Sequence, residues 1–478
     1  MPISTVTVPG KPDFDGLDVS AREFWSQTAP ERETTFAELR RRRPVSWQRP
    51  VESSLMPLPP EPGYWAVVRH ADITEVSRNS EVFISSRGVH MEPVPEDLIE
   101  ASFSFLGMDG QKHAKIRGLV RAAFTPRAVN RLIDSIEANA IRIVRELAES
   151  GSGSDFVRTC AVKLPLVTIS DMMGVPDSQR DAVRDAADAM VSVTDPTFLG
   201  DRNPLEVMVS NQMFLHAIAV KMAQDRRRSP QDDIMTNLVQ AEVNGERLTD
   251  AEIGAFMILM AVAGNDTTRQ TTSLTMRALT EFPDQSAWLT ADFDARIGSA
   301  IEEFVRWSTP VMTFSRIAAR DYELAGQQIA AGDKVVMMYS SGNRDETVFD
   351  NPGVFDLARH PNPHIAFGGG GAHYCLGANL ARAQLRALFG QLMSTLPDIQ
   401  AEEPTFLGGN FIHGVAAMPC HFRGELHCLA KALDTNNPIR GSPGSCWPAP
   451  IPATRKTPTC SMRSTLRSTE PPATTRSR

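Results

Sequence analysis

The sequence predicts a mainly α-helical protein with a minor β component. Apolar residues recur at helical spacing over most of the chain after His113, whereas strand patterns are short and few. Strands and helices do not alternate in the way that a doubly wound parallel sheet requires. The longest fully apolar run, Ala255 to Ala263, is nine residues, far below the about 20 that a membrane span needs.

The N-terminal part of the chain supplies the first strand signal. A Pro-rich stretch over residues 1–60 contains one predicted helix, near 29–43. The segment Tyr64–Val68 then has the composition of a short strand, and 71–78 that of a helix. The following segment, Ile84–Phe105, contains two prolines and no clean period, which predicts a mobile loop.

The middle of the chain is predicted to be helical, and its strongest helix covers about Asp250–Glu281. Thr249 and Glu252 form a capping box at its start, and no proline interrupts it before Pro283. Because this helix is apolar nearly all round until Ala263, we expect it to be buried and to cross most of the molecule. The helices predicted before it cover 113–123, 128–149, 163–174, 178–192, 204–226 and 230–243.

The last third of the body combines helices with short strands. A helix over 295–308 is expected to stop before Pro310. Strand signals follow near 313–319 and 335–339. A turn-rich stretch, 341–374, leads into a final helix over 376–396.

Charge divides the chain of 478 residues into two parts. The net charge of −8 combines a body of −14 over residues 1–422 with a tail of +6 over 423–478. The tail is rich in Pro, Ser, Thr and Arg, which predicts disorder, and its abrupt onset suggests a frameshift or misread stop as a hypothesis. Apart from Cys420 at its end, the body has only Cys160, expected in the core, and Cys375, which fits a reducing cytoplasm. No bulk basic charge indicates nucleic-acid binding.

The segment Phe367-Gly-Gly-Gly-Gly-Ala-His-Tyr-Cys375-Leu-Gly377 carries the strongest functional signal. Four glycines let a backbone approach something flat and bulky, and they can aim N–H groups at a sulfur. The N-terminal dipole of the following helix favours a thiolate. A thiolate held in this way suits haem iron as an axial donor. The alternative is an inert, buried cysteine after a flexible loop.

A second signal lies inside the predicted central helix, in Ala263-Gly264-Asn265-Asp266-Thr267-Thr268. A glycine in a buried helix costs about 1 kcal/mol relative to alanine. Gly264 and Thr267 can open the helical hydrogen-bond ladder and leave a small pocket. A carboxylate and a hydroxyl beside such a pocket can pass protons to a bound ligand. The alternative is a solvated face, against which the preceding apolar block argues.

Together with Glu303-Phe-Val-Arg306, these motifs resemble those of the cytochrome P-450 haem-thiolate monooxygenases, over roughly residues 20–422. The resemblance implies the P-450 fold, with a long central helix over a haem b group. It implies that Cys375 is the axial ligand of the iron, that Asp266 and Thr267 are a catalytic acid–alcohol pair, and that Gly264 and Gly377 adjoin the cofactor. It also implies a structural network of Glu303, Arg306 and Arg359.

The resemblance further implies contacts to the haem propionates. His113 and Arg117 are spaced i, i+4, so they share a helix face, and they precede Phe124-Thr-Pro126 as the family's propionate-binding helix does. Arg316 and His373 match the other propionate contacts. For each residue the alternative is a solvated surface charge.

One departure from the family pattern concerns the cysteine loop. Phe367 lies eight residues before Cys375 instead of the usual seven, which leaves its packing near the thiolate open. The extra glycine, the Ala-Gly-Asn-Asp-Thr-Thr-Arg stretch and the Gly-Asn-Phe-Ile-His-Gly hairpin resemble one bacterial branch. Its members hydroxylate methyl-branched lipids, fatty acids and sterol side chains, often at a terminal carbon.

The implied reaction is monooxygenation with O2 as co-substrate. The chain shows no flavin or iron–sulfur motif, so electrons are expected from a ferredoxin and its ferredoxin reductase, with NAD(P)H acting only through that reductase. Arg121, Arg382 and Arg386 are candidate docking contacts, and a monomer is expected. The alternatives are a peroxygenase and a haem-binding sensor or ligand carrier; the late cysteines match no zinc pattern.

The substrate is expected to be hydrophobic and elongated. The segments that form the substrate walls in the family are apolar and Met-rich in this chain, although any core could contain the same residues. The candidate wall residues are Phe103, Phe105, Met257, Met260, Ala261, Val311, Met312, Phe314, Phe411 and Ile412.

Overall fold

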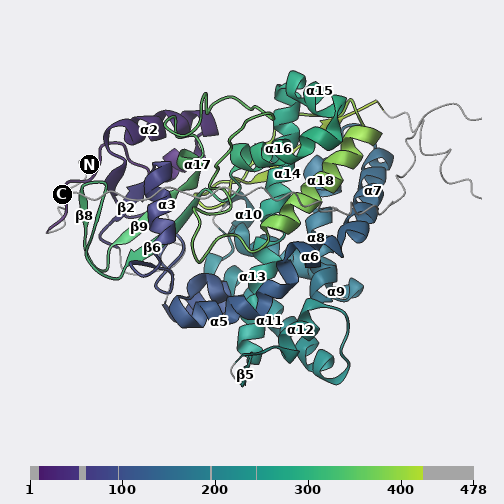
Figure 1. Cartoon of the computed structure of the whole chain (residues 1–478), viewed down its shortest axis with the longest axis horizontal. Helices are drawn as coiled ribbons and strands as arrows, with labels where there is room; N and C mark the ends of the chain where they lie inside the picture. The colour runs from purple at the N-terminus through teal and green to yellow at the C-terminus, as the bar shows by residue number, and fades with distance from the viewer. Residues whose placement is uncertain (1–9, 53–60, 95, 194–195, 244, 424–478) are drawn as a thin grey trace, which may run out of the picture. The chain divides into compact units, whose positions relative to one another are not determined.

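Helices make up most of the structure, and a small sheet lies on one side of them (Figure 1). The computed structural model describes residues 10–52, 61–94, 96–193, 196–243 and 245–423. These residues belong to one compact unit, Met1–His427. Apart from Arg423, the predicted tail lies outside the described residues. In the described part of the chain, no helix has the length and apolarity that crossing a membrane requires.

Five short strands form the main sheet, in the order β1-β2-β9-β6-β3. The pair β2–β9 is parallel, whereas β1–β2, β9–β6 and β6–β3 are antiparallel. The predicted strands near 64–68, 313–319 and 335–339 are confirmed as β2, β6 and β9. The strands of this sheet are β1 (Val45–Gln48), β2 (Tyr64–Val67), β3 (Phe83–Ile84), β6 (Thr313–Ala318) and β9 (Lys334–Met338).

The remaining strands form two-stranded pairs at the periphery. They are β4 (Glu242–Val243), β5 (Glu246–Arg247), β7 (Tyr322–Leu324), β8 (Gln327–Ile329), β10 (Gln400–Ala401), β11 (Thr405–Phe406), β12 (Val415–Ala417) and β13 (Cys420–His421).

The helices pack their apolar faces into one large core, which the sheet extends with smaller clusters. Cys160 lies in the large core, as predicted. Near the sheet are α1 (Arg22–Ser26), α2 (Ala29–Arg42), α3 (His70–Arg78) and α17 (Tyr339–Gly342). The others are α4 (Glu96–Phe103), α5 (Gly110–Arg121), α6 (Pro126–Asn130), α7 (Ile133–Ser150), α8 (Lys163–Met173), α9 (Asp177–Val191), α10 (Pro196–Leu199), α11 (Pro204–Arg228), α12 (Ile234–Gln240), α13 (Asp250–Ala263), α14 (Asp266–Glu281), α15 (Pro283–Ala291), α16 (Phe293–Ser308) and α18 (Ala378–Thr395).

The predicted single helix over 250–281 is wrong in one respect, because Gly264 and Asn265 divide it into α13 and α14. The break lies where Gly264 and Thr267 were expected to open the ladder. The Thr267 hydroxyl donates to the carbonyl oxygen of Ala263 at 2.9 Å, and such side-chain bonds to the i−4 carbonyl bend helices. The capping box of Thr249 and Glu252 is present at the start of α13.

Three other predictions of local structure need correction. The segment 84–105 is not simply a loop, because it contains α4, followed by a 3-10 turn over Ser104–Gly107. Its prolines precede the helix, where proline does not interrupt helical hydrogen bonds. The predicted helix 128–149 is divided into α6 and α7, and 230–243 ends in a strand. Helix α15 was not predicted, because Pro283 was interpreted only as a stop although proline also suits the first turn of a helix.

The carboxylate of Glu303 is buried between two arginines. Arg306 donates to its two oxygens, Oε1 and Oε2, at 2.7 Å each, and Arg359 Nε donates to Oε2 at 3.2 Å. The side chains of Glu303 and Arg306 are 0% exposed. The two guanidinium groups also donate to carbonyl oxygens of the turn-rich segment, namely those of residues 343, 350, 351, 352 and 354.

We predict that Glu303→Ala destabilises the fold by about 3–5 kcal/mol, because it leaves two buried guanidinium charges without their carboxylate. Denaturant unfolding measures the change. The control is Glu281→Ala, which removes the ion-pair partner of Arg277. Because the Glu281 side chain is 42% exposed, this substitution is expected to lower the free energy of unfolding by about 1 kcal/mol or less. Equal effects of the two variants would contradict this role of Glu303.

Candidate functional site

Cys375 lies at the end of a glycine loop, just before α18. Its side chain is accessible although protein surrounds it, as expected for a thiol that faces an internal space. Burial raises the pKa of the thiol, whereas backbone hydrogen bonds from Gly377 and Ala378 and the positive charge of Arg117 act to lower it. The N–H groups aimed at the sulfur therefore belong to the start of the helix and not to the four glycines.

The four glycines have a different role from the one expected of them. Gly368, Gly370 and Gly371 have φ of 97°, 96° and 76°, a region that glycine adopts without strain. A Cβ on Gly371 would lie 2.5 Å from the carbonyl oxygen of Ser77 in α3. The glycines therefore let the loop turn and pack closely against α3, rather than against a flat ligand.

The departure at Phe367 does not separate this residue from the cysteine. The backbone N–H of Cys375 donates to the carbonyl oxygen of Phe367 at 2.9 Å. The Phe367 ring is partly buried, and the guanidinium of Arg382 lies 4.6 Å from its centre. The extra glycine is thus accommodated within a closed loop.

Four positively charged or protonatable side chains gather beside this loop. They come from α5, β6 and the loop itself: His113, Arg117, Arg316 and His373. The rings of His113 and His373 are 4.4 Å apart, and Arg117 donates to the carbonyl oxygen of Tyr374. We call these four residues the cationic cluster; the structure brings together all four residues predicted to contact propionates.

The cationic cluster has more hydrogen-bond donors than the neighbouring carboxylate of Asp109 satisfies among the described residues. Burial, and then the charge of Arg316, lower the pKa of His373 to about 2, so its imidazole is neutral at pH 7. Asp109 lies 4.0 Å from His373, but its carboxylate already accepts from the backbone N–H groups of Ser85 and Ser86. Among the described residues, His113 Nε2 and His373 Nδ1 are buried without a hydrogen-bond partner. Such groups fit an incoming ligand that carries carboxylates.

The cysteine, the cationic cluster and the central helix fit a haem group. Ala263 is exposed although the preceding residues of α13 are almost all buried, and Thr267 beside it is partly accessible. An accessible thiol that receives N–H bonds is the donor that haem iron requires, and the cationic cluster matches its two propionates. Cys375 would hold the iron, and His113, Arg117, Arg316 and His373 would hold the carboxylates.

Asp266 is buried and belongs to a chain of charged groups that sequence reasoning missed. Its Oδ1 accepts from Arg269 and from Gln270 Nε2, whereas its Oδ2 has no partner among the described residues. Arg269 Nη1 also donates to Asp188 of α9 at 2.8 Å. The Asp188 side chain is 30% exposed, so this chain of contacts connects Asp266 with the surface.

Sequence spacing could have indicated part of this chain. Arg269 lies three residues after Asp266, a spacing at which side chains on a helix meet. Asp188 lies 81 positions away on another helix. Burial raises the pKa of its carboxyl above the usual value, although the charge of Arg269 acts to lower it. No local pattern marks it.

Gly264 faces the neighbouring helix α8. A Cβ at this position would lie 2.7 Å from Ile169 Cδ1, so glycine is needed for close helix packing. Met257 and Ala261 line a cavity of about 10 Å³ on this side, with Asn265. Placing Met257 and Ala261 as substrate walls therefore does not fit their positions, because they face α8 and α9.

The other candidate wall residues divide into two groups. Met312 belongs to the core cluster beside the sheet, where Arg32 Nη2 approaches its sulfur at 3.7 Å, and Met260 lies in the large core. Both side chains are buried in the described structure, and their role as substrate walls stays a prediction. Phe105 packs near Phe256. Val311 and Ile412 form a β-bridge. Phe103 and Phe411 lie against His90, which was not predicted, and Phe314 contacts Phe411.

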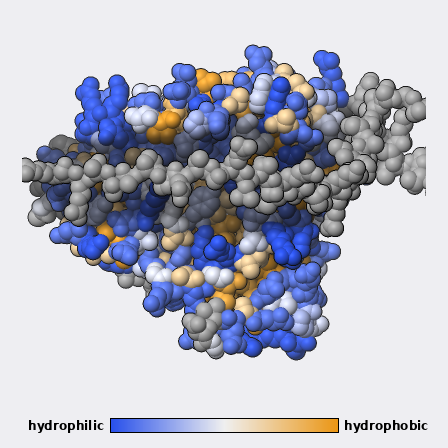
Figure 2. Space-filling view, viewed as in Figure 1, coloured by the Kyte–Doolittle hydropathy of each residue, from blue (hydrophilic) through white to orange (hydrophobic). Residues whose placement is uncertain are grey.

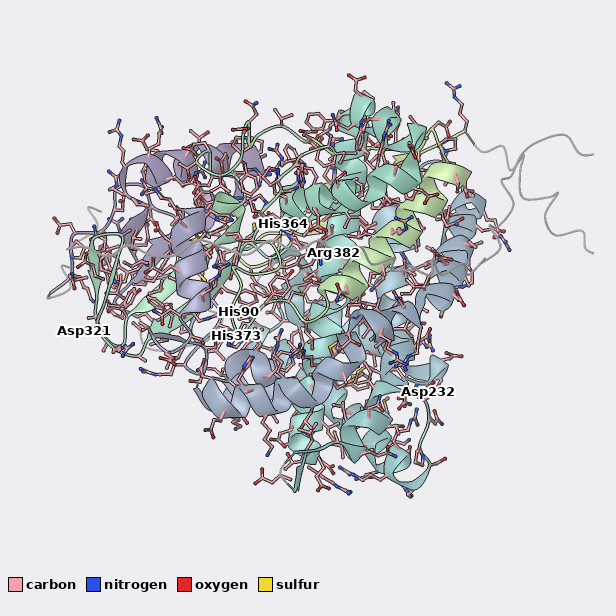
Figure 3. All side chains as sticks on the ribbon, viewed as in Figure 1. His90, Asp232, Asp321, His364, His373 and Arg382 are labelled. Atoms are coloured by element: carbon pink, nitrogen blue, oxygen red, sulfur yellow. The ribbon has the colours of Figure 1, made fainter. Side chains whose placement is uncertain are left out.

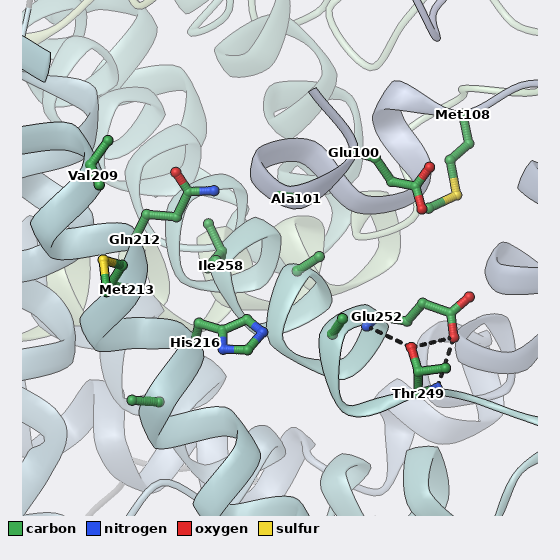
Figure 4. A pocket seen from close by; sticks show the side chains of 13 residues that line it. Glu100, Ala101, Met108, Val209, Gln212, Met213, His216, Thr249, Glu252 and Ile258 are labelled. Atoms are coloured by element: carbon green, nitrogen blue, oxygen red, sulfur yellow. Dashed lines mark hydrogen bonds between the residues drawn. The ribbon is translucent and has the colours of Figure 1, made fainter. Parts of the chain in front are cut away.

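A cleft of about 880 Å³ lies between α4, α11 and α13 (Figure 4). Ala251, Ala255 and Ile258 of α13 contribute to its apolar lining. The cleft also has polar groups: Gln212 and His216 come from α11, and Gln212 Nε2 donates to Ser102 Oγ of α4 at 3.1 Å. The surface in Figure 2 is mostly hydrophilic with smaller apolar patches, and Met213 at this cleft is 67% exposed. The full lining is Glu100, Ala101, Met108, Val209, Gln212, Met213, His216, Ala217, Thr249, Ala251, Glu252, Ala255 and Ile258.

Two of the three candidate docking arginines are already paired. Arg382 donates to both carboxylate oxygens of Glu302, at 2.6 and 2.8 Å, and Arg386 pairs with Asp294 at 2.7 Å. Arg121 is exposed.

Comparisons with known proteins agree with this geometry. The family model described as Cytochrome P450 matches residues 102–397. A methyl-branched lipid omega-hydroxylase of Mycobacterium tuberculosis is 38% identical over 86% of this chain and 96% of its own length. A steroid C26-monooxygenase of Rhodococcus jostii is 39% identical over 86% of this chain and 85% of its own length.

A solved structure shares both the sequence pattern and the fold. Cytochrome P450 CYP268A2 of Mycobacterium marinum, in complex with pseudoionone, is 57% identical to this chain, with a TM-score of 0.85. The match covers 86% of this chain and 100% of that one.

Proposed function

The chain belongs to the cytochrome P450 family of monooxygenases, and from that premise we propose that it hydroxylates a C–H bond of an elongated hydrophobic substrate. The substrate class is a methyl-branched lipid, a fatty acid or a steroid side chain. The observation that carries the proposal is that one fold presents an accessible Cys375 with the cationic cluster beside its loop, together with the Asp266–Thr267 pair at the break of the central helix.

Haem b, when bound, supplies the activation of O2, and a thiolate ligand favours O–O cleavage. The backbone N–H groups of Gly377 and Ala378 stabilise negative charge on the sulfur of Cys375. The cationic cluster would neutralise the propionates and so orient the cofactor. If the propionates left the cationic cluster, His113 Nε2 and His373 Nδ1 would be buried without a partner among the described residues. This cost favours retention of the haem group.

Proton delivery is assigned to Asp266 and Thr267. The Oδ2 of Asp266 has no partner among the described residues, and the contacts through Arg269 to Asp188 lead from Asp266 toward solvent. The Thr267 hydroxyl is anchored on the Ala263 carbonyl beside the helix break. A hydroxyl fixed in this way presents its oxygen at a defined point for proton transfer.

The central helix supports a long substrate. Ala251 and Ala255 of α13 line the cleft, and Ala263 at the end of the same helix is exposed. From Ala255 to Ala263 the helix rises about 12 Å. The relatives named as an omega-hydroxylase and a C26-monooxygenase, and the neighbour solved with pseudoionone, favour the same substrate class.

Electrons are proposed to come from a ferredoxin and its reductase. Arg382 and Arg386 are already paired with Glu302 and Asp294, so an acidic partner protein would meet these carboxylates as well as the arginines. Arg121 is exposed. Arg121 is thus the more direct docking candidate.

We predict that the haem-loaded protein changes from low to high spin when methyl-branched lipids, fatty acids or steroids are added, because a bound hydrophobic substrate excludes water. Titration of the Soret band measures this change. With surrogate ferredoxin, its reductase and NADH, the same compounds should yield hydroxylated products by mass spectrometry. Turnover with peroxide alone would favour a peroxygenase, and binding without any product a sensor or carrier.

We predict that Thr267→Ala keeps haem but diverts NADH-derived electrons into hydrogen peroxide. Product per NADH should fall at least tenfold, because positioned proton transfer contributes about 100-fold or more. The matched control is Thr271→Ala, which removes the same type of i−4 hydrogen bond one turn later, where the side chain is buried. Tight coupling in Thr267→Ala, or equal uncoupling in the control, would contradict the assignment.

A further inference from the structure

His90 lies at the centre of an aromatic cluster built from four separate parts of the chain. Its ring centre is 4.2 Å from that of Phe411 and 4.9 Å from that of Phe103 in α4. Phe314 of β6 is 5.4 Å from Phe411. Figure 3 labels His90 close to His373 in that view.

Backbone contacts fix the position of this imidazole. Ser315 donates from its backbone N–H to the Val89 carbonyl at 2.8 Å and from its hydroxyl to the His90 carbonyl at 2.7 Å. On the other side, Met312 N–H donates to the Phe411 carbonyl at 2.8 Å. The loop that carries His90 is thus anchored to the same strand region as the hairpin that carries Phe411.

A buried polar pair closes the back of the cluster. Asn410 Nδ2 donates to Glu92 Oε1 at 2.7 Å, and each of the two residues is only 5% exposed. Glu92 lies two residues after His90, and Asn410 precedes Phe411. This pair therefore connects the segment that carries His90 with the segment that carries Phe411, and it limits their relative movement.

The ring nitrogens of His90 have no hydrogen-bond partner among the described residues, although the side chain is not fully buried. The side chain is partly accessible although protein surrounds it, which indicates that it faces an internal space. Burial, and then the positive charge of Lys334, lower the pKa of His90 to about 4. At pH 7 the imidazole is therefore neutral, with one nitrogen donating and the other accepting.

The aromatic cluster adjoins the proposed haem site. Phe314 and Arg316 are two residues apart on β6, so their side chains leave the same face of the strand about 7 Å from each other. Arg316 belongs to the cationic cluster, and Phe314 contacts Phe411 beside His90. An unpaired donor and acceptor here would face a molecule bound next to the haem propionates.

We propose that His90 and the rings of Phe103 and Phe411 form a polar subsite that binds a neutral oxygen-bearing group of the substrate, a carbonyl or a hydroxyl. This inference rests on the proposed function and narrows its substrate class to members that carry a carbonyl or a hydroxyl. A carboxylate fits less well, because the nearby Lys334 already binds Glu61 and the Met91 carbonyl.

The test compares two ligands in two proteins. The ligands are a methyl-branched ketone and the alkane of the same carbon skeleton, and the proteins are the haem-loaded wild type and His90→Phe. Phenylalanine keeps a ring in the stack but removes both nitrogens. Spin-state titration should show ketone binding weakened about tenfold by the substitution, with alkane binding unchanged within about twofold.

Two additional measurements separate recognition from general damage. His90→Asn, which retains a donor and an acceptor on a short side chain, should recover part of the ketone affinity. The distribution of hydroxylated positions on the ketone should broaden in His90→Phe, whereas that on the alkane should not change. Haem content and the spectrum of the reduced carbon monoxide complex serve as controls for the folded site.

Several outcomes would overturn the proposal. Equal losses for ketone and alkane, or no loss for either, would show that the His90 nitrogens recognise nothing on the substrate. A matching carboxylate that binds more tightly than the ketone through His90 would contradict the neutral ligand. If neither compound shifts the wild-type spectrum while haem is bound, the substrate class fails, and the subsite fails with it.

Discussion

The carboxylate of Glu303 is the constraint on which the site depends. Held between Arg306 and Arg359, it also accepts the backbone N–H of Asp356 at 3.0 Å, so one buried group organises a segment without regular structure. That segment continues to Ile365, whose N–H donates to the Asn343 side chain at 2.8 Å, and from there into the cysteine loop. Because these hydrogen bonds fix the loop, it can hold the thiol of Cys375 at a defined point although it has no regular secondary structure.

The site places groups that are costly to bury where a ligand can pair with them. Two histidine nitrogens of the cationic cluster and one oxygen of Asp266 are buried without a partner among the described residues. A buried polar group without a hydrogen bond costs about 1–3 kcal/mol, so each of these atoms favours the binding of a partner. The carboxylates of a bound cofactor would be that partner for the histidines, and a water molecule would be one for Asp266. The same logic applies to the imidazole of His90, which a substrate oxygen would satisfy.

Much of the fold and part of the site could be predicted from the sequence, because those features depend on local spacing. Helical periodicity, the capping box of Thr249 and the helix pairs His113–Arg117 and Glu303–Arg306 are all encoded within a few residues. Features that depend on contacts between distant segments were not predictable in this way. The glycines of the cysteine loop are needed because Ser77 approaches them, and Asp188 completes the Asp266 chain from another helix. Met312 was proposed as a substrate wall because it is apolar, but its packing in the core cluster beside the sheet depends on segments distant in the sequence.

Coordination of haem iron by the Cys375 thiolate is the central claim, and the spectrum of the reduced carbon monoxide complex tests it most directly. The purified wild-type protein should give the red-shifted Soret band of a thiolate ligand. Cys375→Ala should abolish that band, while Cys160→Ala, which alters a fully buried cysteine elsewhere in the core, should keep it. A thiolate-type band that persists in Cys375→Ala, or one that never appears in the haem-loaded wild type, would contradict the account.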